Sequence, residues 1–179
     1  QLAAGVRPGI DVVWIEAGSD PWQQMTDSLA ARPGTTAVHL VTHGGEGEII
    51  IDGHAYGTTE LAAHSALLDS WKNYLSADAD LLIYGCKVGA GETALTSSLA
   101  AMTGADVATS ADNTGVGGNW SLEISTGPLE TSTFLTAEAA AAYQGRLATV
   151  ALDGTAGWTA IMYGTGKDPD GDSQAGAAD

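Results

Sequence analysis

The sequence contains one cysteine in 179 residues, so no disulfide can form within the chain. Basic residues are also scarce: 6 Lys and Arg stand against 22 Asp and Glu, a formal net charge of −16. A surface of that charge repels nucleic acid and anionic membranes, and we expect neither as a partner. It suits a protein that is secreted or displayed at a cell surface, in a medium rich in calcium or salt.

Long apolar runs are missing as well, although 44% of the residues are hydrophobic. We therefore expect no insertion into a membrane. Residues 1–9 lack a basic region followed by an apolar stretch, so we expect no signal peptide there and read them as a loose lead-in. The length suits one domain with a tail.

Short apolar runs rich in β-branched residues alternate with segments whose apolar residues recur at helical spacing. The predicted strands are residues 10–16, 37–43, 79–86, 105–110 and 119–125, and the predicted helices are residues 20–31, 58–75, 91–104 and 136–147. An Asp-Gly pair within residues 48–57 predicts a hairpin. This alternation indicates an α/β domain with a mostly parallel sheet and helices on both faces.

His43 and Cys86 each end a predicted strand, and each lies beside glycine. Because the carboxyl ends of parallel strands meet at one edge of a sheet, we expect both side chains at that edge if their strands are neighbours. An imidazole can take the proton of a nearby thiol, so we expect a reactive Cys86 thiolate. The amides of Gly44, Gly45 and Cys86 are candidates for an oxyanion hole. The alternative is a packed cysteine and a histidine that caps a strand.

The order of these motifs resembles the caspase-like cysteine peptidases of clan CD. It is carried by "VHLVTHGGEGEIIIDG", "ADLLIYGCKVGAGE", "LAAMTGADVATSADNTG" and "NWSLEISTGPLE", within residues 10–143. The chain is similar, more closely, to a domain of giant bacterial surface adhesins that continue into cadherin-like or calcium-binding repeats. The resemblance implies a caspase-like three-layer sandwich at residues 10–147, with His43 as base, Cys86 as nucleophile, and Gly44 and Cys86 as the oxyanion hole.

Three functions follow from this resemblance. The first is a bacterial cysteine endopeptidase, a hydrolase that processes its own polypeptide or a partner adhesin outside the cell. The second is a catalytically inactive caspase-like module that binds a partner or spaces an adhesin. The third is a thiol-dependent acyl transferase or hydrolase that uses the same edge of the sheet.

Substrate preference is predicted from acidic residues after the first and fourth strands. In the clan, the residue before the cleaved bond enters a pocket lined by these loops, which here carry Glu16, Asp20 and Asp112. Carboxylates at that place would favour a basic residue. Local roles are equally compatible, since Asp20 can cap a helix and Asp112 can shape a turn.

Arg146 is the predicted cleavage site. It is the only arginine after Cys86, it lies where the recognisable domain ends, and the preceding Gly145 allows an extended approach to a cleft. A tethered segment also has a high effective concentration. The opposing possibility is that residues 136–147 form a packed helix that hides this bond.

The remaining histidines and the acidic tail predict no resident metal in the active site. His39, His54 and His64 show no zinc-ligand spacing with the single cysteine, and we expect structural roles for them. No cofactor is required, and calcium is a candidate regulator or tail ligand. Residues 148–179 read as an acidic tail or the start of a next module, with one or two strands at the sheet edge. Asp168, Asp170 and Asp172 alternate there without the glutamate of an EF-hand.

Overall fold

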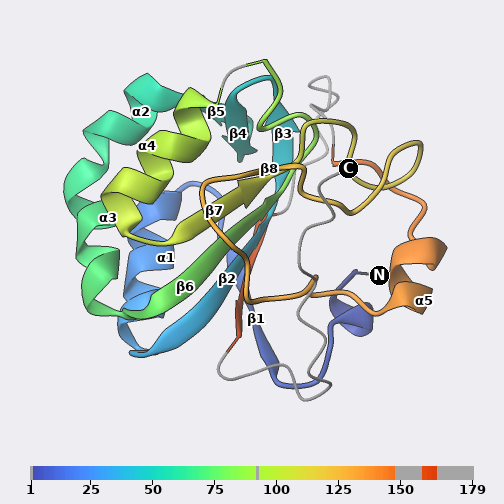
Figure 1. Ribbon diagram of the computed structural model, residues 1–179, viewed down its shortest axis with the longest axis horizontal. Helices are drawn as coiled ribbons and strands as arrows, with labels where there is room; N and C mark the ends of the chain where they lie inside the picture. The colour runs from blue at the N-terminus through green and yellow to red at the C-terminus, as the bar shows by residue number, and fades with distance from the viewer. Residues whose placement is uncertain (1, 92, 148–158, 165–179) are drawn as a thin grey trace.

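A six-stranded mixed sheet forms the centre of the computed structural model, which describes residues 2–91, 93–147 and 159–164 (Figure 1). Its strands are β1 (Ile10–Ile15), β2 (Thr35–Val41), β6 (Leu75–Tyr84), β7 (Asp106–Thr109), β8 (Ile124–Ser125) and β9 (Thr159–Gly164), in the order β1-β9-β2-β6-β7-β8. β1, β2, β6 and β7 run in one direction, whereas β8 and β9 run against their neighbours. The predicted α/β class with a mostly parallel sheet is confirmed.

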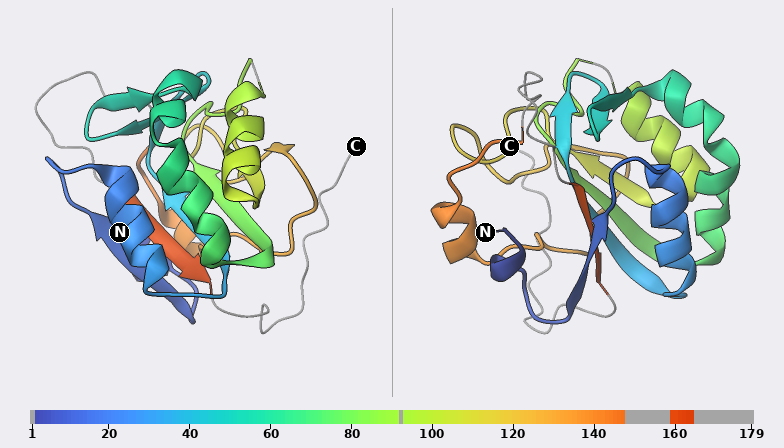
Figure 2. Two further views of the ribbon diagram at one scale, coloured as in Figure 1. Left: turned by 90° about the vertical axis from the view of Figure 1, so that its left-hand side faces the viewer. Right: turned by 180° about the vertical axis from the view of Figure 1, so that it is seen from behind.

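Helices are distributed unequally over the two faces of the sheet. One face carries α1 (Pro21–Ala30), α2 (Thr58–Ala63), α3 (Ser65–Ser70) and α4 (Ala94–Thr103) (Figure 1). The other face carries, among the described residues, the 3-10 turn η1 (Leu2–Gly5), the short α5 (Ala137–Ala142) and long loops (Figure 2). The sequence therefore predicts helices on both faces correctly, but not how little helix covers the second.

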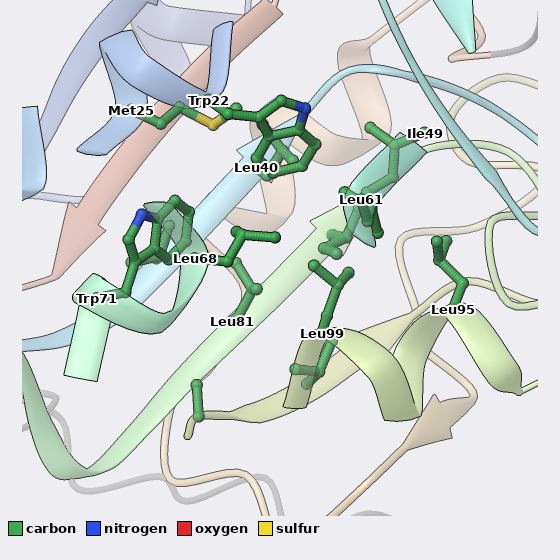
Figure 3. Packing of buried hydrophobic residues seen from close by; sticks show 14 of the residues in the cluster. Trp22, Met25, Leu40, Ile49, Leu61, Leu68, Trp71, Leu81, Leu95 and Leu99 are labelled. Carbon is green, nitrogen blue, oxygen red and sulfur yellow. The ribbon is translucent and has the colours of Figure 1, made fainter. Parts of the chain in front are cut away.

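The helix-face core fills the space between the sheet and α1–α4 (Figure 3). Neighbouring residues of a strand point to opposite faces, and in β2 it is Val38 and Leu40 that point into this core. Its buried members are Trp22, Met25, Leu29, Val38, Leu40, Ile49, Ile51, Leu61, Leu68, Trp71, Leu81, Ile83, Val88, Leu95, Leu99, Ala105 and Val107. The core combines helical and strand periodicity and anchors the carboxyl ends of β2 and β6.

The site-face core lies on the opposite side of the sheet. Its buried members are Leu2, Ala37, Val41, Leu82, Tyr84, Cys86, Phe134, Leu135 and Leu147. Leu2 is only 4% exposed, so the expected loose lead-in is wrong at this residue, which packs beneath α5. Loops cover most of this face. The path of these loops depends on tertiary contacts.

Several predicted elements have different boundaries in the structure. The helix predicted at residues 58–75 breaks at His64, because its ring Nδ1 lies 2.9 Å from the Glu60 carbonyl oxygen and its own amide bonds Leu61 instead. The helix therefore continues as α3 and then as the 3-10 turn η2 (Trp71–Asn73). The strand predicted at residues 37–43 also divides, and the chain leaves the main sheet after Val41.

A second sheet of three strands begins at His43. It consists of β3 (His43–Gly45), β4 (Glu48–Ile51) and β5 (His54–Tyr56), and it includes the predicted hairpin. The last predicted helix, residues 136–147, ends at Ala142 because the backbone becomes extended at Tyr143. β9 lies between β1 and β2, inside the sheet, so the predicted placement of this segment at the sheet edge or in a next module is wrong.

Candidate active site

The register of β2 and β6 brings the His43 and Cys86 motifs to the same edge of the sheet. These strands are parallel neighbours, and Val41 pairs with Tyr84. His43 and Cys86 each lie two residues beyond that pair. The Thr42 amide extends the contact by donating to the Tyr84 carbonyl oxygen at 3.0 Å. The condition for a shared site, that the two strands be neighbours, is met.

Glycine beside each motif permits close approach of the two backbones. A Cβ atom on Gly44 would lie 2.7 Å from the Cys86 carbonyl oxygen and 2.9 Å from the Gly85 carbonyl carbon. A Cβ atom on Gly85 would lie 3.2 Å from the His43 carbonyl oxygen. Side chains at these positions would push the two loops apart, so the "His-Gly" and "Gly-Cys" pairs have a steric reason.

Two amides, one from each motif, point to a single acceptor. The N–H groups of Gly44 and Cys86 donate to the carbonyl oxygen of Leu147, at 3.1 and 3.0 Å respectively. A pair of backbone donors that converge on one carbonyl oxygen has the geometry of an oxyanion hole. The acceptor is supplied by the chain itself.

The Cys86 thiol lies against the loop that follows β7. The side chain is 2% exposed; its sulfur accepts from the Thr114 amide at 3.2 Å and donates to the Thr114 carbonyl oxygen at 3.6 Å. Burial raises the pKa of Cys86, and it outweighs the hydrogen bonds from Thr114 and Leu147 and the positive charge of Arg146, which lower it. In this closed arrangement the thiol is not the ready thiolate that the sequence suggests.

The backbone just after Cys86 adopts a left-handed conformation. Lys87 has φ of 60°, one of two such non-glycine residues in the described chain. The Lys87 amide donates to the Asp112 carbonyl oxygen at 2.7 Å, which holds this turn in place. Unfavourable backbone geometry that is held by neighbours is frequent at functional sites.

The two histidines of this region differ in environment. His43 is half-buried in β3, where it pairs with Ile50, and it directly precedes the Gly44 amide. His39 is fully buried in β2, and its ring packs against those of Tyr84 and Phe134. Burial lowers the pKa of His39 to about 3, so this residue is neutral at pH 7. A packed strand role for His39, as the sequence suggests, agrees with these contacts.

Asp20 and Asp112, the predicted substrate carboxylates, both have local partners. Asp20 caps α1 by accepting from the Trp22 and Gln23 amides at 2.9 and 3.2 Å, and its second oxygen lies 3.5 Å from His64 Nε2. Asp112 accepts from the side-chain amide of Asn119 at 2.9 Å. These contacts fit the capping and turn roles, although Asp112 also lies near enough to Cys86 to raise the pKa of its thiol.

The predicted cleavage residue, Arg146, lies near enough to Cys86 for its positive charge to lower the pKa of the thiol. Its side chain is exposed, and its Nε donates to the Val116 carbonyl oxygen at 2.9 Å. Sequence reasoning missed the neighbouring Leu147 and the Thr114 backbone. The signal for Leu147 was its position, an apolar residue directly after Gly-Arg at the end of the domain.

One group of carboxylates in the described residues could hold a metal ion. Oxygen atoms of Asp80, Asp106 and Glu130 lie within 4.8 Å of one another, beside the amino end of β7. This is the opposite end of the parallel strands from Cys86. The candidate calcium ligands of the tail, Asp168, Asp170 and Asp172, lie outside the described residues.

Comparison with known proteins gives a family for most of the chain. Among the described residues, no helix has the length and apolar character needed to cross a membrane. No curated protein and no solved structure matches the chain. The profile of one protein family matches residues 1–147, from the amino terminus through Leu147. The chain therefore belongs to the family described as a domain of unknown function (DUF4347).

Proposed function

We propose that the chain is a cysteine endopeptidase in which Cys86 is the nucleophile and His43 is the base. The observation that carries this proposal is the convergence of the Gly44 and Cys86 amides on one carbonyl oxygen. Donors in this arrangement stabilise the negative charge that develops on a carbonyl under attack. Each donor comes from one of the two motifs that suggested catalysis in the sequence.

The proposal includes a caspase-like arrangement of the domain and a setting outside the bacterial cell. Two neighbouring parallel strands, one followed two residues later by a histidine and the other by a cysteine, support the first, and the net charge of −16 supports the second. The substrate class is polypeptide: its own chain or a partner adhesin. Nucleic acid is not a partner and no membrane is entered, no cofactor is required, and calcium is a candidate regulator.

The second candidate function is an inactive module that binds a partner or spaces an adhesin. The 2% exposure of Cys86 and the raised pKa of its thiol favour it, because a buried, protonated thiol is a poor nucleophile. The two candidates differ in whether the chain ever passes into a state with an accessible thiolate.

Mass spectrometry of the full chain under denaturing conditions tests the peptidase. We expect the amount of uncleaved wild-type chain to fall with time, with and without calcium, and Cys86→Ala to stay uncleaved. His43→Ala should slow the loss by about 10²-fold or more, as for removal of a general base. His54→Ala, at an exposed histidine of β5, is the matched control and should behave as wild type.

A peptide probe with a thiol-reactive group completes this test. Labelling of Cys86 that depends on His43 supports the peptidase. If the wild-type chain stays intact, Cys86 remains unlabelled, and a fluorogenic peptide that spans residues 143–150 is not cleaved, the inactive module is the better description.

A further inference from the structure

Residues 143–147 pass through the candidate active site as a segment joined to the neighbouring loop by one isolated β-bridge. α5 ends at Ala142, and the chain then pairs antiparallel with the loop that follows Thr114, through a bridge between Gly115 and Arg146. The Val116 amide donates to the Gly145 carbonyl oxygen at 2.7 Å, and the Leu147 amide donates to the Thr114 carbonyl oxygen at 3.0 Å. Addition of an extended segment to an exposed edge is a common mode of peptide recognition.

The end of this segment lies against Cys86. The Leu147 carbonyl oxygen accepts from the Cys86 amide as well as from Gly44. In addition, the Thr114 carbonyl oxygen accepts from both the Leu147 amide and the Cys86 thiol, at 3.0 and 3.6 Å. Leu147 is therefore hydrogen-bonded both to the Cys86 amide and to the Thr114 carbonyl group, which is also the acceptor of the Cys86 thiol. This places its carbonyl group beside the nucleophile.

The side chains of Leu147 and Arg146 have opposite environments. Leu147 is 1% exposed within the site-face core, whose buried members include Val41, Tyr84 and Cys86. Arg146 is exposed, as expected where neighbouring residues of a β-bridged segment point to opposite sides. The residue that fills a buried apolar pocket beside the nucleophile is therefore the leucine.

We propose that the bond between Leu147 and Ala148 is the one this site hydrolyses, and that the site selects a buried apolar residue, here leucine, before that bond. The inference rests on the proposed peptidase function. It moves the cut one residue beyond the predicted position after Arg146. The match to the family profile also ends at Leu147, so the cut would separate the family domain from residues 148–179.

The chemistry balances as a hydrolysis. His43 takes the Cys86 thiol proton, and the sulfur forms a bond to the Leu147 carbonyl carbon while the Gly44 and Cys86 amides stabilise the oxyanion. The carbon–nitrogen bond to Ala148 breaks, and its nitrogen takes the proton from His43. Water then adds to the thioester, and this step releases the Leu147 carboxylate and restores the thiol.

The position of β9 decides how the product must be detected. β9 pairs with β1 on one side and β2 on the other, so residues beyond the cut stay hydrogen-bonded within the sheet. We expect the two fragments to co-elute under native conditions and to separate only on denaturation. Native size alone would not reveal the cut.

The test uses the full chain in H₂¹⁸O, followed by denaturing mass spectrometry and mapping of new termini. We expect an amino terminus at Ala148 and one ¹⁸O atom in the Leu147 carboxylate, both absent in Cys86→Ala. Leu147→Lys should slow the cut by at least about 100-fold, because a charge would enter an apolar pocket. Leu147→Met should retain cleavage at the same bond.

Two further variants keep the test valid if Leu147→Lys fails to fold. Ala148→Pro retains Leu147 and should abolish the cut, because the peptide bond between residues 147 and 148 becomes a tertiary amide. Arg146→Ala removes the neighbouring positive charge that lowers the pKa of Cys86, so it should slow the cut by less than about tenfold and leave it at the same bond. Arg32→Ala, at an arginine that bonds Asp11 and Ser28, is the control and should leave the rate unchanged. Loss of the cut in Arg146→Ala with retention in Leu147→Lys would overturn the assignment in favour of arginine.

The remaining outcomes separate this inference from the proposed function. A cut that needs Cys86 but lies at another bond overturns the inference and leaves the peptidase intact. So does cleavage of the fluorogenic peptide at a bond other than Leu147–Ala148. A ligated product in place of an ¹⁸O-labelled carboxylate overturns hydrolysis in favour of acyl transfer. An intact chain with no peptide cleavage overturns both proposals.

Discussion

The two faces of the central sheet are built in different ways. The helix-face core is closed by four helices and its members are hydrophobic; one of them, Trp71, donates from Nε1 to the hydroxyl of the buried Thr26 at 2.8 Å. The site-face core is closed mainly by loops and by the β-bridged segment that ends at Leu147. It also contains Cys86 and lies against the buried His39.

This difference suggests that one face stabilises the fold and the other carries the candidate active site. Apolar packing on regular elements fixes the positions of β2 and β6, and with them the two motifs. The other face carries groups that cost free energy when buried, such as a thiol and an imidazole whose ring nitrogens have no hydrogen-bond partner among the described residues. Cover made of loops can also separate from the sheet more easily than a helix layer.

The largest expected effect compares a leucine from each face. Leu99→Ala in α4 should lower the free energy of unfolding by about 2–5 kcal/mol, the usual range for a buried leucine. Leu147→Ala should cost less than half as much, because residues 143–147 can detach without loss of the helix-face core. Urea unfolding of the Cys86→Ala background, which excludes cleavage, measures both. Equal losses would contradict the division between faces.

A pH dependence is expected from the neutral, buried His39. The pKa of His39 is lowered to about 3 in the fold, against 6.5 ordinarily. As the pH falls, the unfolded chain therefore binds a proton at a higher pH than the folded chain does. The contribution of His39 to the free energy of unfolding is complete above pH 6.5 and is lost as the pH drops toward 3. The slope is up to about 1.4 kcal/mol per pH unit, or about 2 kcal/mol at pH 5.

Replacement of His39 isolates this contribution. In His39→Leu, the loss of stability between pH 7 and pH 5 should be smaller by that amount, as measured by urea unfolding at the two pH values. His54→Ala is the control, since His54 is exposed and should leave the slope unchanged. An identical slope in His39→Leu and wild type would show that His39 is not the titrating group.

A methyl group at Gly44 should disturb the site more than the sheet. The added Cβ would meet backbone atoms of Gly85 and Cys86 at under 3.0 Å, which we expect to cost about 1–3 kcal/mol of stability. The shift should also weaken the bond from the Gly44 amide to Leu147. Hydrogen exchange in the Cys86→Ala background should show faster exchange at the Cys86 amide, with α4 unchanged. Uniform acceleration across the chain would instead indicate global destabilisation.

The smallest expected effect concerns Arg146, at the exposed rim of the site face. Arg146→Ala should change the free energy of unfolding by less than about 0.5 kcal/mol, as is usual for surface residues. Arg146 lowers the pKa of Cys86, so its removal should move the alkylation profile of Cys86 to higher pH. Arg32→Ala is the control, because Arg32 bonds Ser28 and Asp11, which are distant from Cys86 in the sequence. A profile that stays in place would contradict this electrostatic coupling.

Much of the fold follows from local patterns in the sequence. β-branched runs marked β1, β2, β6 and β7, and helical spacing with a capping Asp20 marked α1. The glycines beside His43 and Cys86 indicated the two motifs, and they are needed because the backbones of these motifs approach each other closely. Predictions failed where a side chain competed for a backbone partner, as at His64, or where an apparent helix ended early, as at Tyr143.

The α/β class, the two strands that come just before His43 and Cys86, and the acidic character of the molecule could all be predicted from the sequence alone. These depend on residue type and on contacts between near neighbours. Tertiary contacts were needed to place Thr159–Gly164 between β1 and β2, and to bring the Leu147 carbonyl to two amides from distant motifs. The reason is physical: backbone hydrogen bonds across long sequence separations involve groups that every residue carries, so side-chain patterns do not encode their partners.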